Sequence, residues 1–187
     1  MITVGIDYSM SSPCVCVHTG DDFSYSGCKF YYLTNGRKYD IDWNGIHGDL
    51  HEDYVSDQQR YDNIAKWALS LMPEGARVYM EGYSMGSTGM IFNVAENAGW
   101  LKGLMYRRGI GFKVVPPTVI KKFATGKGNA NKERLQECFI EETGVDVKRA
   151  LGMTEKQWNP SSDIIDAYYI CKYGHEQEKI HGNLECN

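Results

Sequence analysis

The chain has 187 residues, of which 42% are hydrophobic and 24% charged, with a formal net charge of −4. These values are typical of one compact globular domain. No apolar stretch approaches a bilayer span, which excludes a membrane-embedded chain. Because the N-terminus also lacks the features of a signal peptide, we expect a cytoplasmic protein with reduced cysteines.

The first part of the chain predicts an antiparallel meander followed by a helix. Apolar runs and alternating patterns favour strands, and the Asn35-Gly36 pair is a hairpin signal. In chain order, the predicted elements are strands at 2–7, 13–18 and 23–33, a continuation of the meander at 38–43, an acidic loop or insertion at 44–56, and a helix at 57–72.

The second part predicts strands that alternate with helices. The elements are a strand at 77–81, an amphipathic helix at 88–108, a short strand at 112–115, and helices at about 117–123, 132–143 and 160–173. Asn131 is suited to begin the 132–143 helix and Gly144 to end it. A mobile basic loop is predicted at 125–130.

This order of elements predicts an α/β fold. We expect a mixed five-stranded sheet, with the meander first and parallel strands after it, and helices on both faces. Residues 1–174 are predicted to form a single domain, followed by a loose polar tail at 175–187.

Four acidic residues lie where the predicted elements begin or end. Asp7 and Glu81 end two apolar strands, and Asp163 and Asp166 are three residues apart in the first turn of the last helix. Parallel neighbouring strands would bring the first two together at one edge of the sheet, and helical spacing puts the second two on one face. Buried carboxylates need a positive partner, and Mg²⁺ or Mn²⁺ prefers such oxygen ligands. The pattern therefore predicts a metal-dependent nuclease.

Charge is distributed unevenly along the chain. Residues 40–62 hold seven acids and one base, whereas residues 101–134 hold nine bases and one acid. A local positive excess of this kind can bind a phosphate backbone even though the whole chain is acidic. We expect Lys121, Lys122 and Lys127 to contact DNA.

Taken together, the Gly5-Ile6-Asp7 strand end, the strand ending in Glu81 and the Asp163-Ile164-Ile165-Asp166-Ala167 helix start resemble the RuvC-type Holliday-junction resolvases. The resemblance covers about residues 1–174. It implies an RNase H-like fold, two Mg²⁺ ions for which Mn²⁺ can substitute, branched DNA as substrate, and a homodimer. Compact versions of this enzyme are typical of bacteriophages, which would place the protein in the host cytoplasm.

The resemblance also implies roles for residues outside the acidic set. Lys132, with Lys121 or Lys122, falls where these resolvases carry basic residues before the final acids, and Lys132 would act in catalysis. Tyr83 stands where an aromatic side chain often stacks on an unpaired base. The sequence departs from the family at Asp7-Tyr8-Ser9, where Asp-Pro-Gly is usual, and at Ile164-Ile165, where small residues are usual.

Other interpretations remain open at this point. An RNase H-type ribonuclease acting on RNA–DNA hybrids and a non-catalytic branched-DNA-binding module would share the same pattern. The sugar-kinase and actin-like ATPases also end their first strand in Gly-Ile-Asp, but they need glycine-rich phosphate loops that this chain lacks. A separate metal site at Cys14, Cys16 and His18, which alternate on one predicted strand, is a further alternative.

Overall fold

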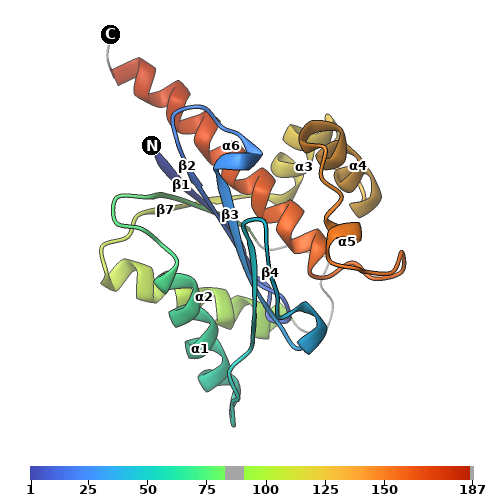
Figure 1. Ribbon diagram of the computed structural model, residues 1–187. Helices are drawn as coiled ribbons and strands as arrows, with labels where there is room; N and C mark the ends of the chain where they lie inside the picture. Colours follow the sequence, from blue (N-terminus) through green and yellow to red (C-terminus); the bar gives the residue numbers. More distant parts are fainter. Residues whose placement is uncertain (83–90, 186–187) are drawn as a thin grey trace.

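The computed structural model describes residues 1–82 and 91–185, and over these residues its centre is a seven-stranded mixed sheet (Figure 1). The strand order across the sheet is β4-β5-β3-β2-β1-β6-β7. The strand bounds are β1 Ile2–Asp7, β2 Cys14–Thr19, β3 Cys28–Thr34, β4 Asp42–Trp43, β5 Ile46–Leu50, β6 Arg77–Glu81 and β7 Phe112–Val115. The α/β class and the mixed sheet are confirmed, but the predicted number of five strands is wrong.

The two additional strands come from the segment for which a meander extension and a loop were predicted. β5 pairs in parallel with β3, and β4 pairs antiparallel with β5. Gly48 of β5 lies so close to Tyr32 and the backbone of Tyr39 that a Cβ at this position would overlap both. Acidic residues and glycines mask the strand pattern here, and long-range pairing with β3 overrides the low local propensity.

The rest of the sheet follows the predicted connections. β1, β2 and β3 form the antiparallel meander, while β1 pairs in parallel with β6, and β6 with β7. β1 is therefore an inner strand with an antiparallel neighbour on one side and a parallel neighbour on the other. Val4 and Ile6 are fully buried, as expected for a strand covered on both faces.

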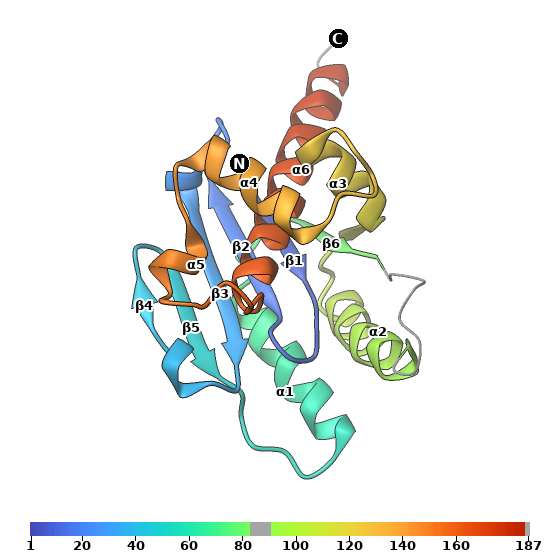
Figure 2. The ribbon, with the colours of Figure 1, turned by 90° about the vertical axis from the view of Figure 1, so that its right-hand side faces the viewer.

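Helices cover both faces of the sheet, as predicted (Figures 1 and 2). One apolar core packs β1 and β6 against α1 and α2, and a second packs β2 and β3 against α3 to α6. The bounds are α1 Asp57–Ser70, α2 Ile91–Arg107, α3 Pro117–Thr125, α4 Lys132–Thr143, α5 Val147–Ala150 and α6 Ser161–Glu185, with 3-10 turns η1 Tyr25–Gly27 and η2 Arg37–Tyr39. Within the described part of the chain, no helix has the length and hydropathy needed to cross a bilayer.

Both ends of α4 are set by the residues that the sequence indicated. The Asn131 side chain accepts a hydrogen bond from the Arg134 backbone amide at 3.0 Å, which begins α4. Gly144 ends the same helix in the left-handed conformation, with φ of 71°, where glycine carries no Cβ penalty. Gly126 ends α3 in the same way.

The last helix, α6, is longer than predicted. It continues through residue 174 to Glu185, so residues 175–185 extend the helix and the prediction of a loose tail there is wrong. His175 is buried beside Thr3, and Glu178 accepts hydrogen bonds from Tyr79 and Lys113 at 2.6 and 2.7 Å. These polar residues are anchored by partners distant in sequence, which the local pattern cannot reveal. The assignment of residues 1–174 to one domain stays a proposal.

Gly5 allows α6 to lie directly against β1. A Cβ at Gly5 would overlap backbone atoms of Ala167 and Cys171, and one at Gly174 would overlap the ring of Tyr79. The Cys171 thiol donates a hydrogen bond to the Thr3 carbonyl at 3.3 Å. At Gly5, the atoms that would meet an added Cβ belong to the backbone and not to flexible side-chain ends. Only glycine at this position therefore permits the close approach of α6 to β1.

We expect Gly5→Ala to destabilise the protein by about 3 kcal/mol or more, at the upper end for overpacking. The control is Gly111→Ala, since a Cβ there has nothing within 4 Å. Urea unfolding monitored by circular dichroism measures both variants. Equal stability of the two would show that the close approach of α6 to β1 does not depend on glycine.

Candidate active site

Asp7 and Glu81 lie side by side at the carboxyl ends of two neighbouring inner strands, β1 and β6. The parallel register pairs Ile6 of β1 with Met80 of β6, so the acids that follow each residue end neighbouring strands, which are spaced about 4.8 Å apart. Ile6 and Met80 are almost fully buried, and their packing fixes where the two strand ends emerge. This juxtaposition was predicted from the sequence.

The first turn of α6 brings Asp163 and Asp166 to the same place. Asp163 is 6% exposed, and its carboxyl group is hydrogen-bonded to that of Asp7. Asp166 acts electrostatically on Asp7 and Glu81. The helix reaches this position because Gly5, two residues before Asp7, leaves room for its backbone. The four predicted acids are therefore gathered from three elements, β1, β6 and α6.

Burial and mutual repulsion govern the charge of Asp7 and Asp163. Burial, followed by the charges of the other three acids, holds the pKa of Asp7 well above its usual value. Burial also raises the pKa of Asp163, to about 6, against hydrogen bonds from Ser12 and Asp7 that favour the ionised form. Two carboxyl groups hydrogen-bonded to each other share one proton.

Glu81 and Asp166 are perturbed in the same direction. Burial raises the pKa of Glu81 to about 7, opposed by the charge of Lys121. Burial and the charge of Glu81 raise the pKa of Asp166 to about 7, opposed by Lys132 and Lys121. The cluster is therefore short of positive charge near neutral pH, and the two lysines only partly supply it.

The predicted basic residues divide into two groups. Lys121 of α3 and Lys132 at the start of α4 lie close enough to influence the acids, and Lys132 Nζ donates to Ser162 Oγ at 3.3 Å. Lys122 and Lys127 are exposed on α3 and the loop after it, and neither is among the main causes of the pKa shifts of the acids. Tyr83 lies outside the described residues, so its stacking role stays a prediction.

The donor set fits a hard divalent cation. It consists of four buried or half-buried carboxylates, and a cation would offset the burial and the mutual repulsion that raise their pKa values. Over residues 1–82 and 91–185, no three His, Cys, Asp or Glu side chains already surround one metal position.

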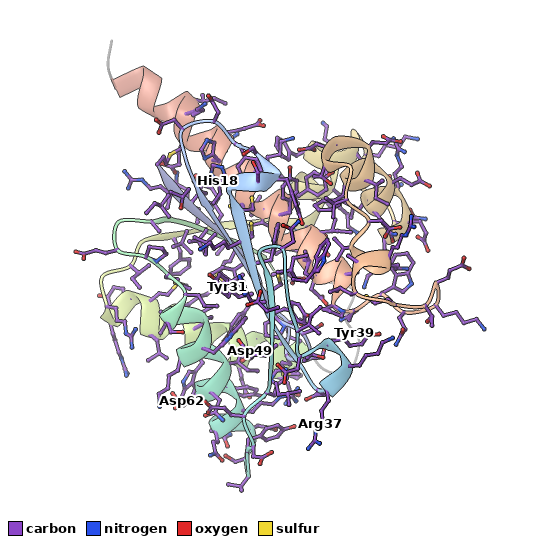
Figure 3. All side chains as sticks on the ribbon, viewed as in Figure 1. His18, Tyr31, Arg37, Tyr39, Asp49 and Asp62 are labelled. Carbon is purple, nitrogen blue, oxygen red and sulfur yellow. The ribbon has the colours of Figure 1, made fainter. Side chains whose placement is uncertain are left out.

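Cys14, Cys16 and His18 do not form a second site. Cys14 pairs with Asp7 across the strands, whereas His18 lies at the other end of β2, near the C-terminal half of α6 (Figure 3). There its ring packs against His175 and Phe23, with centroids 4.8 and 4.5 Å apart. Alternation puts the three side chains on one face of the strand but spaces them too far apart to share an ion.

Two residues beside the acids were not identified from the sequence. Ser12 Oγ donates to Asp163 Oδ2 at 2.5 Å, and Asn159 Nδ2 donates to Ser12 Oγ at 2.7 Å. Ser12 belongs to the β1–β2 loop and Asn159 to the segment before α6, so 147 residues separate them. Local pattern indicates only turns at both places, and no spacing rule links them to the acids.

Solved structures of known proteins are similar to this structure, although no similarity was found at the level of sequence families. No family model and no curated protein sequence matches the chain. A structure of RuvC from Thermus thermophilus is similar with a TM-score of 0.60 and 18% identity, covering 97% of both chains. The same protein in complex with a Holliday-junction substrate gives 0.54 and 15%, covering 91% of this chain and 90% of that one.

A viral protein gives a similar result. The fowlpox virus resolvase, solved with Holliday-junction DNA, matches with a TM-score of 0.54 and 15% identity, covering 95% of this chain and 98% of that one. Near-complete coverage in both directions means that the similarity extends over the whole fold and not over a shared fragment. The chain therefore has the same overall fold as Thermus thermophilus RuvC and the fowlpox virus resolvase.

Proposed function

We propose that this protein is a structure-selective endodeoxyribonuclease that resolves four-way DNA junctions and other branched DNA by metal-dependent phosphodiester hydrolysis. The observation that supports it most strongly is the convergence of Asp7, Glu81, Asp163 and Asp166 at one edge of a resolvase-like fold. We also propose that it acts in the cytoplasm, or in the host cytoplasm if a bacteriophage encodes it.

The four carboxylates would hold two Mg²⁺ ions, with Mn²⁺ as a substitute. A bound pair of this kind supplies an activated water and stabilises the leaving oxygen of a phosphodiester. Asp7 interacts with all three other acids, so it is the residue best placed to serve both ions. Lys132, beside Asp163, would stabilise the negative charge that develops on the phosphate.

Basic residues next to the acids would position the DNA. Lys121 would contact the phosphate nearest the acids, since it already acts electrostatically on Glu81 and Asp166. Lys122 of α3 and Lys127 of the loop after it are exposed. They would bind the phosphate backbone of the DNA arms. Phosphate contacts of this kind fix register and orientation without reading sequence.

We further propose that the protein acts as a homodimer through α2, because two symmetric nicks in a four-way junction suit a two-fold assembly. Phe92 and Tyr106 are 78% and 83% exposed on this helix. Gly99 and Gly103 have open space beside them, so a second helix could approach closely. An antiparallel α2 centred between these glycines would bring Glu96 of one copy near Arg107 of the other.

We expect Gly103→Glu to convert the dimer to monomers, because a charged side chain would occupy the point of closest approach. Sedimentation velocity at micromolar concentration measures the change, with Gly111→Glu as the control for an added charge at an open glycine. Purely monomeric wild-type protein, both alone and bound to junction DNA, would contradict the dimer.

A substrate panel tests the proposed activity itself. The protein is incubated with a four-way junction, a flap, an RNA–DNA hybrid and a linear duplex, each with Mg²⁺ and with EDTA. We expect Mg²⁺-dependent paired nicks in the junction and little cleavage of linear duplex. Preferential cleavage of the hybrid would instead identify a ribonuclease, and binding without any nicking would identify a branched-DNA-binding module.

A further inference from the structure

A chain of hydrogen bonds joins Lys132 to Asp163 through three uncharged side chains. Lys132 Nζ donates to Ser162 Oγ at 3.3 Å, and Ser162 Oγ donates to Asn159 Oδ1 at 3.3 Å. Asn159 Nδ2 then donates to Ser12 Oγ at 2.7 Å, and Ser12 Oγ donates to Asp163 Oδ2 at 2.5 Å. We call this set, Lys132, Ser162, Asn159, Ser12 and Asp163, the relay.

The chemistry of the groups fixes the direction of every bond in the relay. An ammonium group can only donate and an amide oxygen can only accept, so the Ser162 hydroxyl must point to Asn159. The Asn159 amide nitrogen can only donate, which leaves the Ser12 hydrogen for the Asp163 carboxylate. If the Asn159 amide were turned over, its oxygen would accept the Ser12 hydrogen, and Asp163 Oδ2 would lose its hydrogen bond from Ser12.

The loop that carries Ser12 is held from outside the site. Arg60 of α1 donates to the Met10 carbonyl at 2.7 Å, and His51 lies 3.0 Å from the Ser11 carbonyl. The Ser12 backbone amide donates to Ser9 Oγ at 3.1 Å. His51 follows β5 directly, so the segment predicted to be a loop or insertion helps to fix the loop beside the acids.

From this geometry we propose that Ser12 is a positioning residue: it fixes the orientation of the Asp163 carboxylate for a divalent cation, and Asn159 in turn orients Ser12. The inference rests on the proposed function only in assuming that Asp163 is a metal ligand. Ser12 is 4% exposed, so water does not replace its hydroxyl freely. Removal of a partner that orients a metal-ligating group typically lowers metal affinity about 10- to 100-fold.

The test measures cation binding without DNA. Mn²⁺ is titrated into each protein, and the rise in thermal midpoint gives an apparent affinity, because a ligand that binds only the folded state stabilises it. We expect Ser12→Ala to need about 10- to 100-fold more Mn²⁺ than the wild type. Ser70→Ala is the matched control, since it removes an exposed hydroxyl that donates one bond, to the Trp67 carbonyl at 2.7 Å, and it should leave the titration unchanged.

A second variant keeps the test decisive if Ser12→Ala fails to fold. Asn159→Ala removes the group that orients Ser12 but leaves the hydroxyl in place, so we expect a smaller shift in the same direction. An unchanged Mn²⁺ titration for a folded Ser12→Ala, or for Asn159→Ala where that is the folded variant, overturns the inference. So does a wild-type protein that Mn²⁺ does not stabilise.

The outcomes separate this inference from the proposed activity. If the wild type binds Mn²⁺ and Ser12→Ala weakens that binding, the relay stands even when no branched substrate is cleaved. If junctions are cleaved but Ser12→Ala binds Mn²⁺ as the wild type does, the nuclease stands and the relay falls. With a cleaving wild type, saturating Mn²⁺ should restore most of the rate of Ser12→Ala, because a positioning defect raises the metal requirement more than it lowers the maximal rate.

Discussion

Asp7→Asn should abolish junction cleavage while leaving junction binding in Ca²⁺ intact. Asp7 faces Asp163 and acts on Asp166 and Glu81 as well, so no other acid can replace its charge. Asparagine keeps the shape of the side chain but loses the anionic oxygen. Removing one preorganised electrostatic group typically costs about 10²- to 10³-fold in rate, and we expect at least the upper end here. Single-turnover cleavage and a gel-shift assay measure the two effects.

Two further variants define what the Asp7 result means. Asp49→Asn removes an exposed carboxylate near the end of β5, which β3 and β2 separate from β1 in the sheet, and it should cleave normally. Lys132→Ala should lower the cleavage rate with little loss of fold, since Lys132 is exposed apart from its bond to Ser162. Full cleavage by Asp7→Asn would remove Asp7 from the mechanism.

Without divalent cations, the acidic cluster should make the protein less stable as the pH rises. The pKa of Glu81 is raised from 4.5 to about 7, so between these values the folded state binds more protons than the unfolded state. Stability then falls with increasing pH. The contribution is fully present below pH 4.5 and is lost as the pH passes through about 7.

Glu81→Gln isolates this effect. The variant cannot ionise at position 81. In EDTA, we therefore expect the free energy of unfolding of the variant minus that of the wild type to be about 1 to 3 kcal/mol larger at pH 7.5 than at pH 4.5, since each pKa unit corresponds to about 1.4 kcal/mol. Urea unfolding at both pH values measures the difference. Burial lowers the pKa of His18 to about 4, which acts in the opposite direction, but this effect is common to both proteins and cancels.

Mg²⁺ should reverse the same trend. A cation that neutralises the carboxylates stabilises the wild type more at pH 7.5 than at pH 5, where protons already compete for the same oxygens. Glu81→Gln should gain less from Mg²⁺ than the wild type at pH 7.5. A difference in free energy of unfolding between Glu81→Gln and the wild type that does not change with pH in EDTA would show that the folded state does not raise the pKa of Glu81.

Local sequence signals were sufficient where chemistry within a few residues decides the structure. The strands at 77–81 and 112–115 and the helix from Lys132 to Thr143 have the predicted bounds, because apolar runs and caps act over one or two turns. The pairing of Asp7 with Glu81 also followed, since two parallel strands that end in acids must present them at the same edge.

Elements that depend on partners distant in sequence were not predictable in this way. β5 is a strand because β3 offers it a parallel edge and Gly48 fits against Tyr32, although its own residues are acidic and glycine-rich. The end of α6 is helical because His175 and Glu178 find partners on β1, β6 and β7. Polar composition alone indicated a loose tail.

The residue types of the site were determined by the sequence: four acids at the ends of apolar elements, and lysines between the second and third of those elements. The surroundings of the acids were decided only by the tertiary structure. Ser12 reaches Asp163 across 151 residues, and a hydrogen bond over that separation leaves no periodicity or spacing in the chain. It exists because Gly5 lets α6 settle against β1, which brings the loop after β1 and the start of α6 within bonding distance.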